Sequence, residues 1–273
     1  MTLRPGGVGC YVAGAAGWPG PSLLHVRVLI LGGTGEARAL AAALHARPDV
    51  DVVSSLAGRV RDPALPVGEV RIGGFGGAAG LIGFLRTEGI DAVVDATHPF
   101  AATITEHAVA ATAHLALPLA LLRRPAWSER PNWTRTPDIA AAAAAAAAFP
   151  VTSGRVFLTT GRRDLAAFAS DERHEYLVRT VDPPHEKAMP LHSLLILDRG
   201  PYTVAGEAAL MARYDVRLLV TKDSGGPMTS AKLAAAEQLA VPVVVVDRPP
   251  PPRGALVIED VDAAISWLGS AVA

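Results

Sequence analysis

Cysteine, charge of either sign and long apolar runs are all scarce in this chain. A single cysteine, Cys10, among 273 residues excludes an internal disulfide framework and indicates a reducing compartment. Asp, Arg, Pro or Gly interrupts every apolar stretch before the roughly 18 residues that a membrane span needs. The formal net charge of -1 gives no global basic field for nucleic acid or an anionic membrane. We therefore expect a cytoplasmic protein whose ligands are small molecules.

Two families of catalytic motif are also missing. The histidines lack a paired spacing such as H-x-x-x-H backed by a carboxylate, and no second cysteine is available, so we predict no metal site. No G-x-S-x-G elbow occurs, which argues against a serine hydrolase of that type. The chemistry is therefore expected to reside in loops that bind a ligand or a cofactor.

One stretch near the start of the ordered sequence predicts such a loop. Residues 26–31 form an apolar run typical of a strand buried on both faces of a parallel sheet. Gly32, Gly33 and Gly35 then allow a tight turn, and residues 36–44 have helical composition. A helix N-terminus at this corner suits the pyrophosphate of a dinucleotide. The third glycine of G-x-G-x-x-G is absent, so a simple strand-to-helix turn is the alternative.

The end of the second predicted strand, residues 50–55, bears on the choice of cofactor. An acidic residue there would bind the ribose hydroxyls of NAD, but this chain offers Ser55 and Arg59. A hydroxyl and a guanidinium suit a 2′-phosphate, which predicts NADPH. An exposed surface arginine is the alternative interpretation of Arg59.

A further strand, beginning at Asp91, runs into a loop and then into a helix expected to begin near Pro99. Residues at the carboxyl end of a parallel strand line the ligand crevice. His98 is a candidate acid there, or alternatively shapes the turn before the proline. The complete predicted cofactor site is Gly32, Gly33, Thr34, Gly35, Glu36, Ser55, Arg59, Asp95, Ala96, Thr97, His98, Pro99 and Phe100.

The second half of the sequence repeats the strand–helix alternation after a proline- and tryptophan-containing stretch. Two loops there, residues 159–164 and 222–226, follow strands and precede helices, and a third follows the strand at 193–197. They concentrate hydroxyls, backbone N–H groups and cations, which together suit carboxylates or phosphates. Solvated loop charges are the alternative for any single arginine. A dinucleotide half beside a half for an anionic ligand suits hydride transfer.

These patterns predict an α/β protein with two Rossmann-like parallel-sheet domains that face each other across an active-site cleft. We place a disordered extension at residues 1–24, the NADPH-binding domain at 25–123, a linker at 124–136 and the substrate-binding domain at 137–273. The glycines of residues 1–24 break what would otherwise resemble a secretory signal.

Four motifs in this order resemble the precorrin-6A reductase family of cobalamin biosynthesis. They are Ile30–Ala37, Asp95–Ala101, Thr159–Arg162 and Thr221–Gly226, the last followed by Lys232. The resemblance implies NADPH-dependent reduction of one carbon–carbon double bond of the tetrapyrrole precorrin-6A, giving precorrin-6B. It also implies a cleft between two Rossmann-like halves and transient contact with neighbouring pathway enzymes. Family members often carry Asn where this chain has Asp223.

The resemblance assigns a ligand to the loops of the second half, because the macrocycle bears many acetate and propionate arms. Tyr202 and His98 are the catalytic candidates, as donors of a proton, with water as the alternative. The implied substrate site is Thr160, Gly161, Arg162, Arg163, Arg199, Tyr202, Lys222, Asp223, Ser224, Gly225 and Gly226.

Three alternatives accompany this interpretation. The cobalt-containing substrate of the anaerobic route would need the same hydride chemistry. A two-lobed protein that only binds an anionic ligand would not need the glycine loop and Arg59. A methyltransferase with a methionine-derived cofactor would favour an acidic residue where Ser55 and Arg59 stand.

Overall fold

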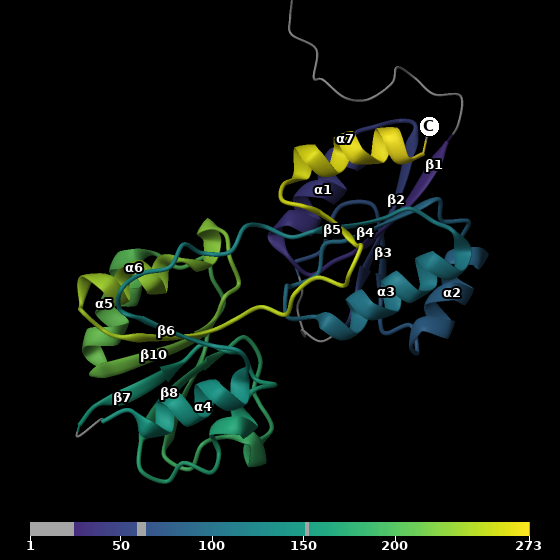
Figure 1. The fold of residues 1–273 in the computed structure, drawn as a ribbon. Helices are drawn as coiled ribbons and strands as arrows, with labels where there is room; N and C mark the ends of the chain where they lie inside the picture. The colour runs from purple at the N-terminus through teal and green to yellow at the C-terminus, as the bar shows by residue number, and fades with distance from the viewer. Residues whose placement is uncertain (1–24, 59–63, 151–152, 273) are drawn as a thin grey trace, which may run out of the picture.

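The computed structural model describes residues 25–58, 64–150 and 153–272, which form two α/β lobes side by side (Figure 1). Each lobe contains a six-stranded sheet in which every paired strand is parallel to its neighbours. The predicted fold class is therefore confirmed. The predicted extension at 1–24 lies outside the described residues.

The sheet of the first lobe has the strand order β12-β5-β4-β1-β2-β3, the order of a dinucleotide-binding fold with β12 in the sixth place. Its strands are β1 (Val26–Leu31), β2 (Val50–Leu56), β3 (Glu69–Ile72), β4 (Ala92–Asp95), β5 (Leu119–Leu122) and β12 (Leu256–Ile258). Its helices are α1 (Gly35–His45), α2 (Ala78–Thr87), α3 (Ala102–Leu115) and α7 (Val261–Ala271).

Alternation along β1 explains the three layers of this lobe. Val28 and Ile30 pack with the buried faces of α1 and α7, whereas Leu29 and Leu31 pack with α2 and α3 on the other side. Because both faces are covered, the strand is apolar at nearly every position. Each such leucine or isoleucine contributes about 1.5–3 kcal/mol when it is fully buried.

The sheet of the second lobe has the order β6-β11-β10-β7-β8-β9. Its strands are β6 (Trp133–Thr136), β7 (Arg155–Leu158), β8 (Glu175–Thr180), β9 (Ser193–Leu197), β10 (Val216–Lys222) and β11 (Val243–Val246). The α-helices are α4 (Ile139–Ala148), α5 (Val204–Arg213) and α6 (Ala231–Gln238), and the short 3₁₀ turns are η1 (Leu165–Phe168), η2 (Glu186–Ala188) and η3 (Pro227–Thr229). Helix α4 and η1 cover one face of the sheet, and α5 and α6 cover the other.

The chain crosses between the lobes twice, at residues 123–132 and again at 247–255 (Figure 1). After the second crossing, β12 pairs with β5, and Ala264 and Leu268 of α7 pack in the core with Leu40 of α1. The predicted boundary of 137–273 for the second domain is therefore wrong at its C-terminal end. The predicted linker 124–136 is also too long, because β6 pairs with β11. The alternation of strand and helix patterns along the sequence predicts that a strand exists, but it does not show which sheet the strand joins.

Two local predictions also differ from the structure. The helix after β4 begins at Ala102 and not near Pro99, because residues 97–101 form a turn in which the Ala101 N–H donates to the His98 carbonyl. The helix expected after the loop at 159–164 is a single 3₁₀ turn, Leu165–Phe168. Both changes lengthen a loop at the carboxyl end of a strand, where a ligand would bind.

Candidate functional site

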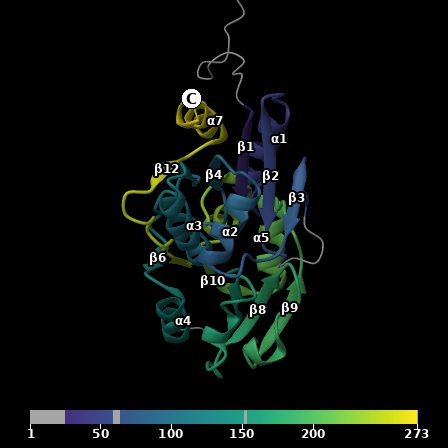
Figure 2. The same cartoon turned by 90° about the vertical axis from the view of Figure 1, so that its right-hand side faces the viewer.

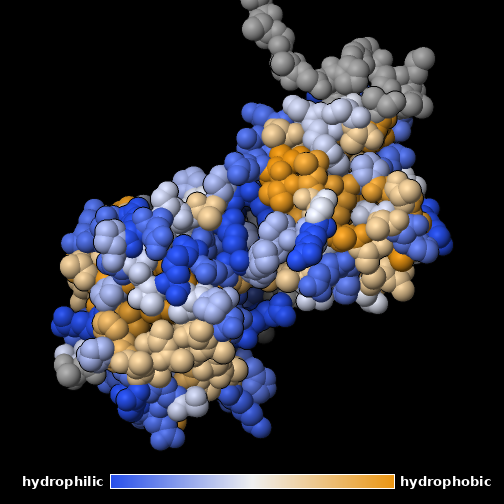
Figure 3. All heavy atoms as spheres, viewed as in Figure 1, coloured by the Kyte–Doolittle hydropathy of each residue, from blue (hydrophilic) through white to orange (hydrophobic). Residues whose placement is uncertain are grey.

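The carboxyl ends of the two sheets border one cavity of about 560 Å³. The first lobe contributes residues that follow β1, β2, β3 and β4, and the second lobe contributes the end of β10 and the loop after β7. Its lining residues include Gly32, Gly33, Ser55, residues 73–77, Thr97, His98, Phe100, Arg163, Asp164 and Lys222. On the face shown in Figure 3, hydrophilic residues gather where the two lobes meet. The predicted cleft between two sheets is therefore present.

The corner between β1 and α1 has the geometry that its glycines predict. Gly33 has a φ of 118°, and a Cβ built on it would meet no atom within 4 Å, so the backbone here is both glycine-specific and open. Thr34 caps α1: its hydroxyl accepts a hydrogen bond from the Ala37 N–H at 3.1 Å and donates to the Ala96 carbonyl at 2.7 Å. Gly35 is the first residue of the helix. The first turn of α1 is thereby held beside the cavity.

Glu36, in that first turn, points its carboxylate at Arg124 in the first of the two crossing segments, which together form the hinge between the lobes. Its Oε2 lies 2.7 Å from Nη1 of Arg124, and Nε of Arg124 donates to the Ser224 carbonyl at 2.6 Å. The arginine is largely buried between the lobes. Glu36 therefore joins the lobes through Arg124, a contact that the sequence analysis missed.

Asp95 ends β4 and is 3% exposed. Its carboxylate accepts hydrogen bonds from the N–H and hydroxyl of Thr97, at 3.0 and 2.6 Å, and from the hydroxyl of Thr105 at 2.6 Å. The Asp95 carboxylate therefore shapes the loop that places Thr97 at the cavity. Ala96 contributes only its backbone, and the Pro99 side chain is buried away from the cavity lining.

His98 bridges the lobes. Its Nδ1 accepts from the Phe100 N–H at 3.3 Å, which places the ring proton on Nε2, and Nε2 donates to the hydroxyl of Ser224 at 3.0 Å. Burial and then the nearby cations Arg124, Lys222, Arg248 and Lys232 lower the pKa of His98 to about 3. The imidazole is therefore neutral at physiological pH, and its one proton is already donated to Ser224.

Phe100 and Lys222 form a second contact across the cleft. The ammonium of Lys222 lies 4.9 Å from the centroid of the Phe100 ring and forms an ion pair with Asp164. The Phe100 ring also packs against the apolar core of the second lobe, although it belongs to a loop of the first. Lys222 and Arg163 are the predicted substrate residues that the structure brings to the cavity.

The residues of the loop after β7 differ in their surroundings. Arg163 lines the cavity, whereas Nη1 of its neighbour Arg162 lies 3.6 Å from Asp182. Thr160 is 5% exposed, and within the described residues its hydroxyl has no hydrogen-bond partner. Gly161 has a φ of 92° with open space where a Cβ would stand. Arg162 and Arg163 therefore have different surroundings, a difference that could not be predicted from the sequence.

The burial of Asp223 contradicts one expectation about the loop at residues 222–226. It is 0% exposed and accepts hydrogen bonds from Arg135 at 2.8 Å, from the Trp127 N–H at 3.2 Å and from Arg248 at 3.3 Å. A carboxylate with these three partners and no exposed surface stabilises the hinge and has no face for a substrate. The predicted direct contact of Asp223 with substrate is therefore not supported.

The two glycines that follow have the same role in the hinge. A Cβ on Gly225 would lie 2.2 Å from the Pro125 carbonyl oxygen, and one on Gly226 would lie 2.6 Å from Cδ of Arg124. Both residues have positive φ, 65° and 70°. These positions need glycine because the crossing segment packs on them, which is a different reason from the predicted contact with a ligand.

Tyr202 and Arg199 lie outside the cavity lining. The Arg179 guanidinium stacks on the Tyr202 ring at 3.8 Å, and two hydrogen bonds to Glu207 hold the arginine in place. Burial raises the pKa of Tyr202, so the phenol stays protonated at neutral pH. The structure thus does not bring these two predicted residues together with Arg163 and Lys222.

The loop at residues 73–77 is a part of the cavity wall that the sequence analysis left without a role. Arg71 of β3 donates to the carbonyls of Gly73 and Gly74, lies 3.5 Å from the Ser55 hydroxyl and stacks on the Phe75 ring at 3.9 Å. The density of glycine in this segment was the available signal. Arg59, the predicted partner of Ser55, lies outside the described residues.

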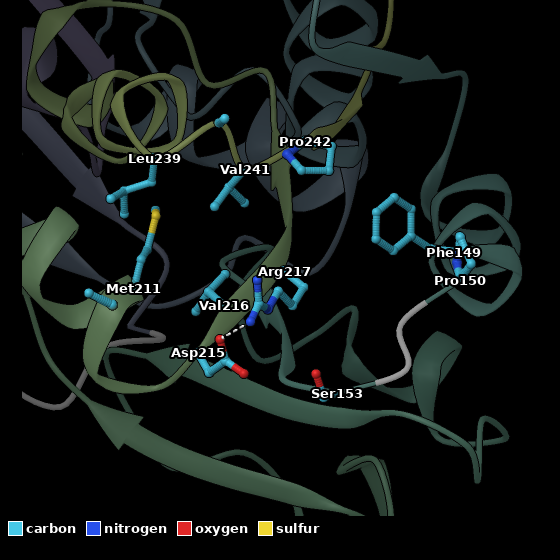
Figure 4. A pocket seen from close by; sticks show the side chains of 12 residues that line it. Phe149, Pro150, Ser153, Met211, Asp215, Val216, Arg217, Leu239, Val241 and Pro242 are labelled. Atoms are coloured by element: carbon cyan, nitrogen blue, oxygen red, sulfur yellow. Dashed lines mark ion pairs between the residues drawn. The ribbon is translucent and has the colours of Figure 1, made fainter.

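A second cavity, of about 490 Å³, lies at the opposite ends of the strands in the second lobe (Figure 4). Met211, Leu239 and Val241 contribute apolar surface, and the Arg217 and Asp215 side chains pair with each other at 2.7 Å. Because its charges are paired and it lies at the amino ends of β10 and β11, it lacks the donor set of the cleft. Within the described residues, no group of three or more metal-ligating side chains occurs. No described helix has the length and apolarity needed to cross a membrane.

Comparisons with known proteins agree with this geometry. The family model described as precorrin-6x reductase CbiJ/CobK matches residues 27–269. A precorrin-6A reductase of Rhodococcus erythropolis is 54% identical over 89% of this chain and 98% of its own length. One from Mycobacterium tuberculosis is 51% identical over 89% and 97%. A solved CobK precorrin-6A reductase superposes with a TM-score of 0.84 at 39% identity and covers 91% of this chain and 98% of its own.

Proposed function

The chain belongs to the precorrin-6x reductase family, and from that premise we propose that it reduces precorrin-6A in the cytoplasm with a hydride taken from NADPH. Membership of this reductase family implies a nicotinamide cofactor and a tetrapyrrole substrate in cobalamin biosynthesis. The observation that supports the proposal best is the shared cavity, in which an open glycine corner of one lobe faces cations of the other.

The residues of the first lobe fit a dinucleotide. Gly33 leaves room for a pyrophosphate to approach the backbone, and the capped first turn of α1 offers a partial positive charge beside it. Ser55 lines the cavity at the end of β2, where a 2′-phosphate would bind. We assign the remaining recognition of that phosphate to Arg59. When bound, the cofactor supplies the hydride and the protein orients it.

The cations of the second lobe fit a substrate that carries several carboxylates. Arg163 and Lys222 reach the cavity, and Arg124, Arg248 and Lys232 add to the positive field that depresses the pKa of His98. Each hydrogen bond from such a cation to a carboxylate contributes about 1.5–3 kcal/mol. We choose the metal-free substrate over the cobalt-containing one, because the relatives with 54% and 51% identity are named for precorrin-6A.

The proton that completes the reduction must reach the carbon next to the one that accepts the hydride. The Nε2 proton of His98 is held by Ser224, which argues against His98 as the acid. The raised pKa of Tyr202 keeps its hydroxyl protonated, but the ring lies outside the cavity lining, so a closer approach of its loop would be needed. We therefore assign the proton to water and a positioning role to His98.

Turnover of a defined substrate tests the proposal. Purified full-length protein is incubated with NADPH and either metal-free or cobalt-loaded precorrin-6A, and the nicotinamide absorbance is followed. We expect NADPH oxidation with the metal-free substrate. If neither substrate causes oxidation and NADPH does not bind, the two-lobed binding protein becomes the better interpretation.

The 2′-phosphate assignment has its own test. Arg59→Ala should weaken the binding of NADPH at least tenfold more than that of NADH, about 1.4 kcal/mol, because only NADPH carries the extra phosphate. Arg86→Ala on α2, whose guanidinium contacts His114, is the matched control and should leave both affinities unchanged. An equal loss of affinity for both cofactors would contradict the assignment.

A further inference from the structure

Strand β9 differs from the other sheet edges of the molecule. Each sheet ends in two edge strands, which are β12 and β3 in the first lobe and β6 and β9 in the second. Proteins protect such edges by keeping them short or by placing charges on them. Strand β3 contains Glu69 and Arg71, β6 contains Arg135, and β12 has only three residues. Strand β9 has five residues, Ser193–Leu197, and none of them is charged.

Four of the five side chains of β9 are apolar, and leucines are exposed on both faces of the sheet. Leu194, Leu195 and Leu197 are 42%, 36% and 51% exposed, and Leu191 just before the strand is 66% exposed. Figure 2 shows β9 as the outermost strand of its lobe. In the described part of the chain, no strand pairs with its outer edge. An apolar edge of this length is a template for pairing with another strand.

The hydrogen bonds to β8 define which backbone groups are free. The His192 carbonyl accepts from the Tyr176 N–H, and the Asp198 N–H donates to the Thr180 carbonyl. Because backbone direction alternates along a strand, the even-numbered residues of β9 face β8. The N–H and C=O groups of Ser193, Leu195 and Leu197 therefore point outwards.

We propose that this edge pairs with the same edge of a second copy of this chain, antiparallel about a two-fold axis at Leu195. Leu195 then lies opposite its own copy, and Ser193 lies opposite Leu197, so the three outward-facing residues of each copy form about six backbone hydrogen bonds in all. The two six-stranded sheets join into one continuous sheet.

Complementary polar side chains support this antiparallel register. The two-fold axis at Leu195 places the exposed His192 of one copy opposite the exposed Asp198 of the other, once at each end of the paired strands. Leu194 and Ile196 face each other across the axis on one side of the sheet. Ile196 already packs on the apolar core of its own lobe, so the pairing extends that core between the copies.

The experiment measures mass and dissociation constant by analytical ultracentrifugation of the full-length chain across the micromolar range. We expect a dimer of twice the 28.2 kDa chain mass. Leu195→Lys should raise the dissociation constant about tenfold or more, because it places two ammonium groups at the axis. Val257→Lys, on the edge strand β12, is the matched control and should leave the dimer intact. Circular dichroism and thermal unfolding establish that both variants fold.

A charge exchange tests the register separately. His192→Asp places two carboxylates opposite each other and should weaken the dimer, whereas the double variant H192D/D198H restores the opposite pairing and should recover it. A monomer at every concentration would overturn the proposal, as would a dimer that Val257→Lys breaks and Leu195→Lys does not. Dimerisation only of a chain that lacks residues 1–24 would also overturn the proposal.

Discussion

Asp95 and Asp223 occupy equivalent places in the two lobes, at the carboxyl end of an inner strand, yet their partners differ in kind. Asp95 accepts from the neutral groups of Thr97 and Thr105 within its own lobe. Asp223 accepts from the guanidinium groups of Arg135 and Arg248 and from Trp127 of the crossing segment. The first lobe therefore completes its ligand loop internally, whereas the second lobe uses its loop to hold the hinge.

The comparison also separates two kinds of positive charge in the cleft. Arg135 and Arg248 both pair with one buried carboxylate, that of Asp223. Arg163 lines the cavity beside Lys222, which pairs with Asp164. Buried ion pairs hold the lobes in place, whereas a cation at the cavity wall can bind a charged ligand. The predictions below test this division, from the largest expected effect to the smallest.

Asp223→Ala should have the largest effect on stability. Removal of the carboxylate leaves the Arg135 and Arg248 guanidinium groups without it, and we expect the free energy of unfolding to fall by about 3–5 kcal/mol. Denaturant unfolding measures this loss. Asp223→Asn keeps an acceptor for the Trp127 N–H and should cost less. A loss below about 1 kcal/mol for the alanine variant would show that the hinge does not depend on this carboxylate.

Arg163→Ala should have the largest effect on the substrate among variants that fold normally. Loss of one charged hydrogen bond of about 1.5–3 kcal/mol should raise KM for the tetrapyrrole roughly ten- to one-hundredfold. Arg162→Ala is the matched control, because its guanidinium lies beside Asp182 outside the cavity lining. If Arg163→Ala weakens only NADPH binding, Arg163 belongs to the cofactor site and the proposed division of the cavity changes.

Thr34→Ala should affect the first lobe by a smaller amount. The variant loses the cap of α1 and the hydrogen bond to Ala96, which should lower the free energy of unfolding by about 1–2 kcal/mol and weaken NADPH binding. Thr34→Ser keeps both hydrogen bonds and should restore both quantities, as measured by unfolding and by titration calorimetry. If the serine variant is as weak as the alanine variant, the hydroxyl is not the cause.

At neutral pH, His98 should have the smallest effect on stability, and its contribution becomes visible as the pH is lowered. Its pKa is lowered from 6.5 to about 3, so the unfolded chain takes up a proton as pH falls below 6.5 while the folded chain does not. His98 therefore destabilises the fold increasingly as pH falls below 6.5, by at most about 1.4 kcal/mol per pH unit. Between pH 6.5 and 5, above the range of most carboxylates, His98→Gln should flatten this slope. An unchanged slope would show that His98 is protonated in the folded protein.

Local order along the chain followed from the sequence with small errors. Strand β1 occupies the expected residues 26–31, and α1 spans Gly35–His45 where helical composition was noted at 36–44. The apolar run and the alanine-rich helix depend on neighbouring residues alone, so their pattern is visible in one dimension. The glycine corner followed in the same way, because only a residue without Cβ adopts the φ of Gly33.

The way in which those elements assemble could be seen only in the tertiary structure. Whether β12 returns to the first sheet depends on the pairing of Leu256–Ile258 with residues more than a hundred positions earlier, and no local pattern encodes it. The burial of Asp223 and the difference between Arg162 and Arg163 arise in the same way, from what the fold packs against each side chain. The sequence by itself determined the two parallel sheets, the glycine corner and the supply of cations. Only the tertiary structure decided which of these charges face a ligand, because burial and pairing are set by segments far apart in the chain.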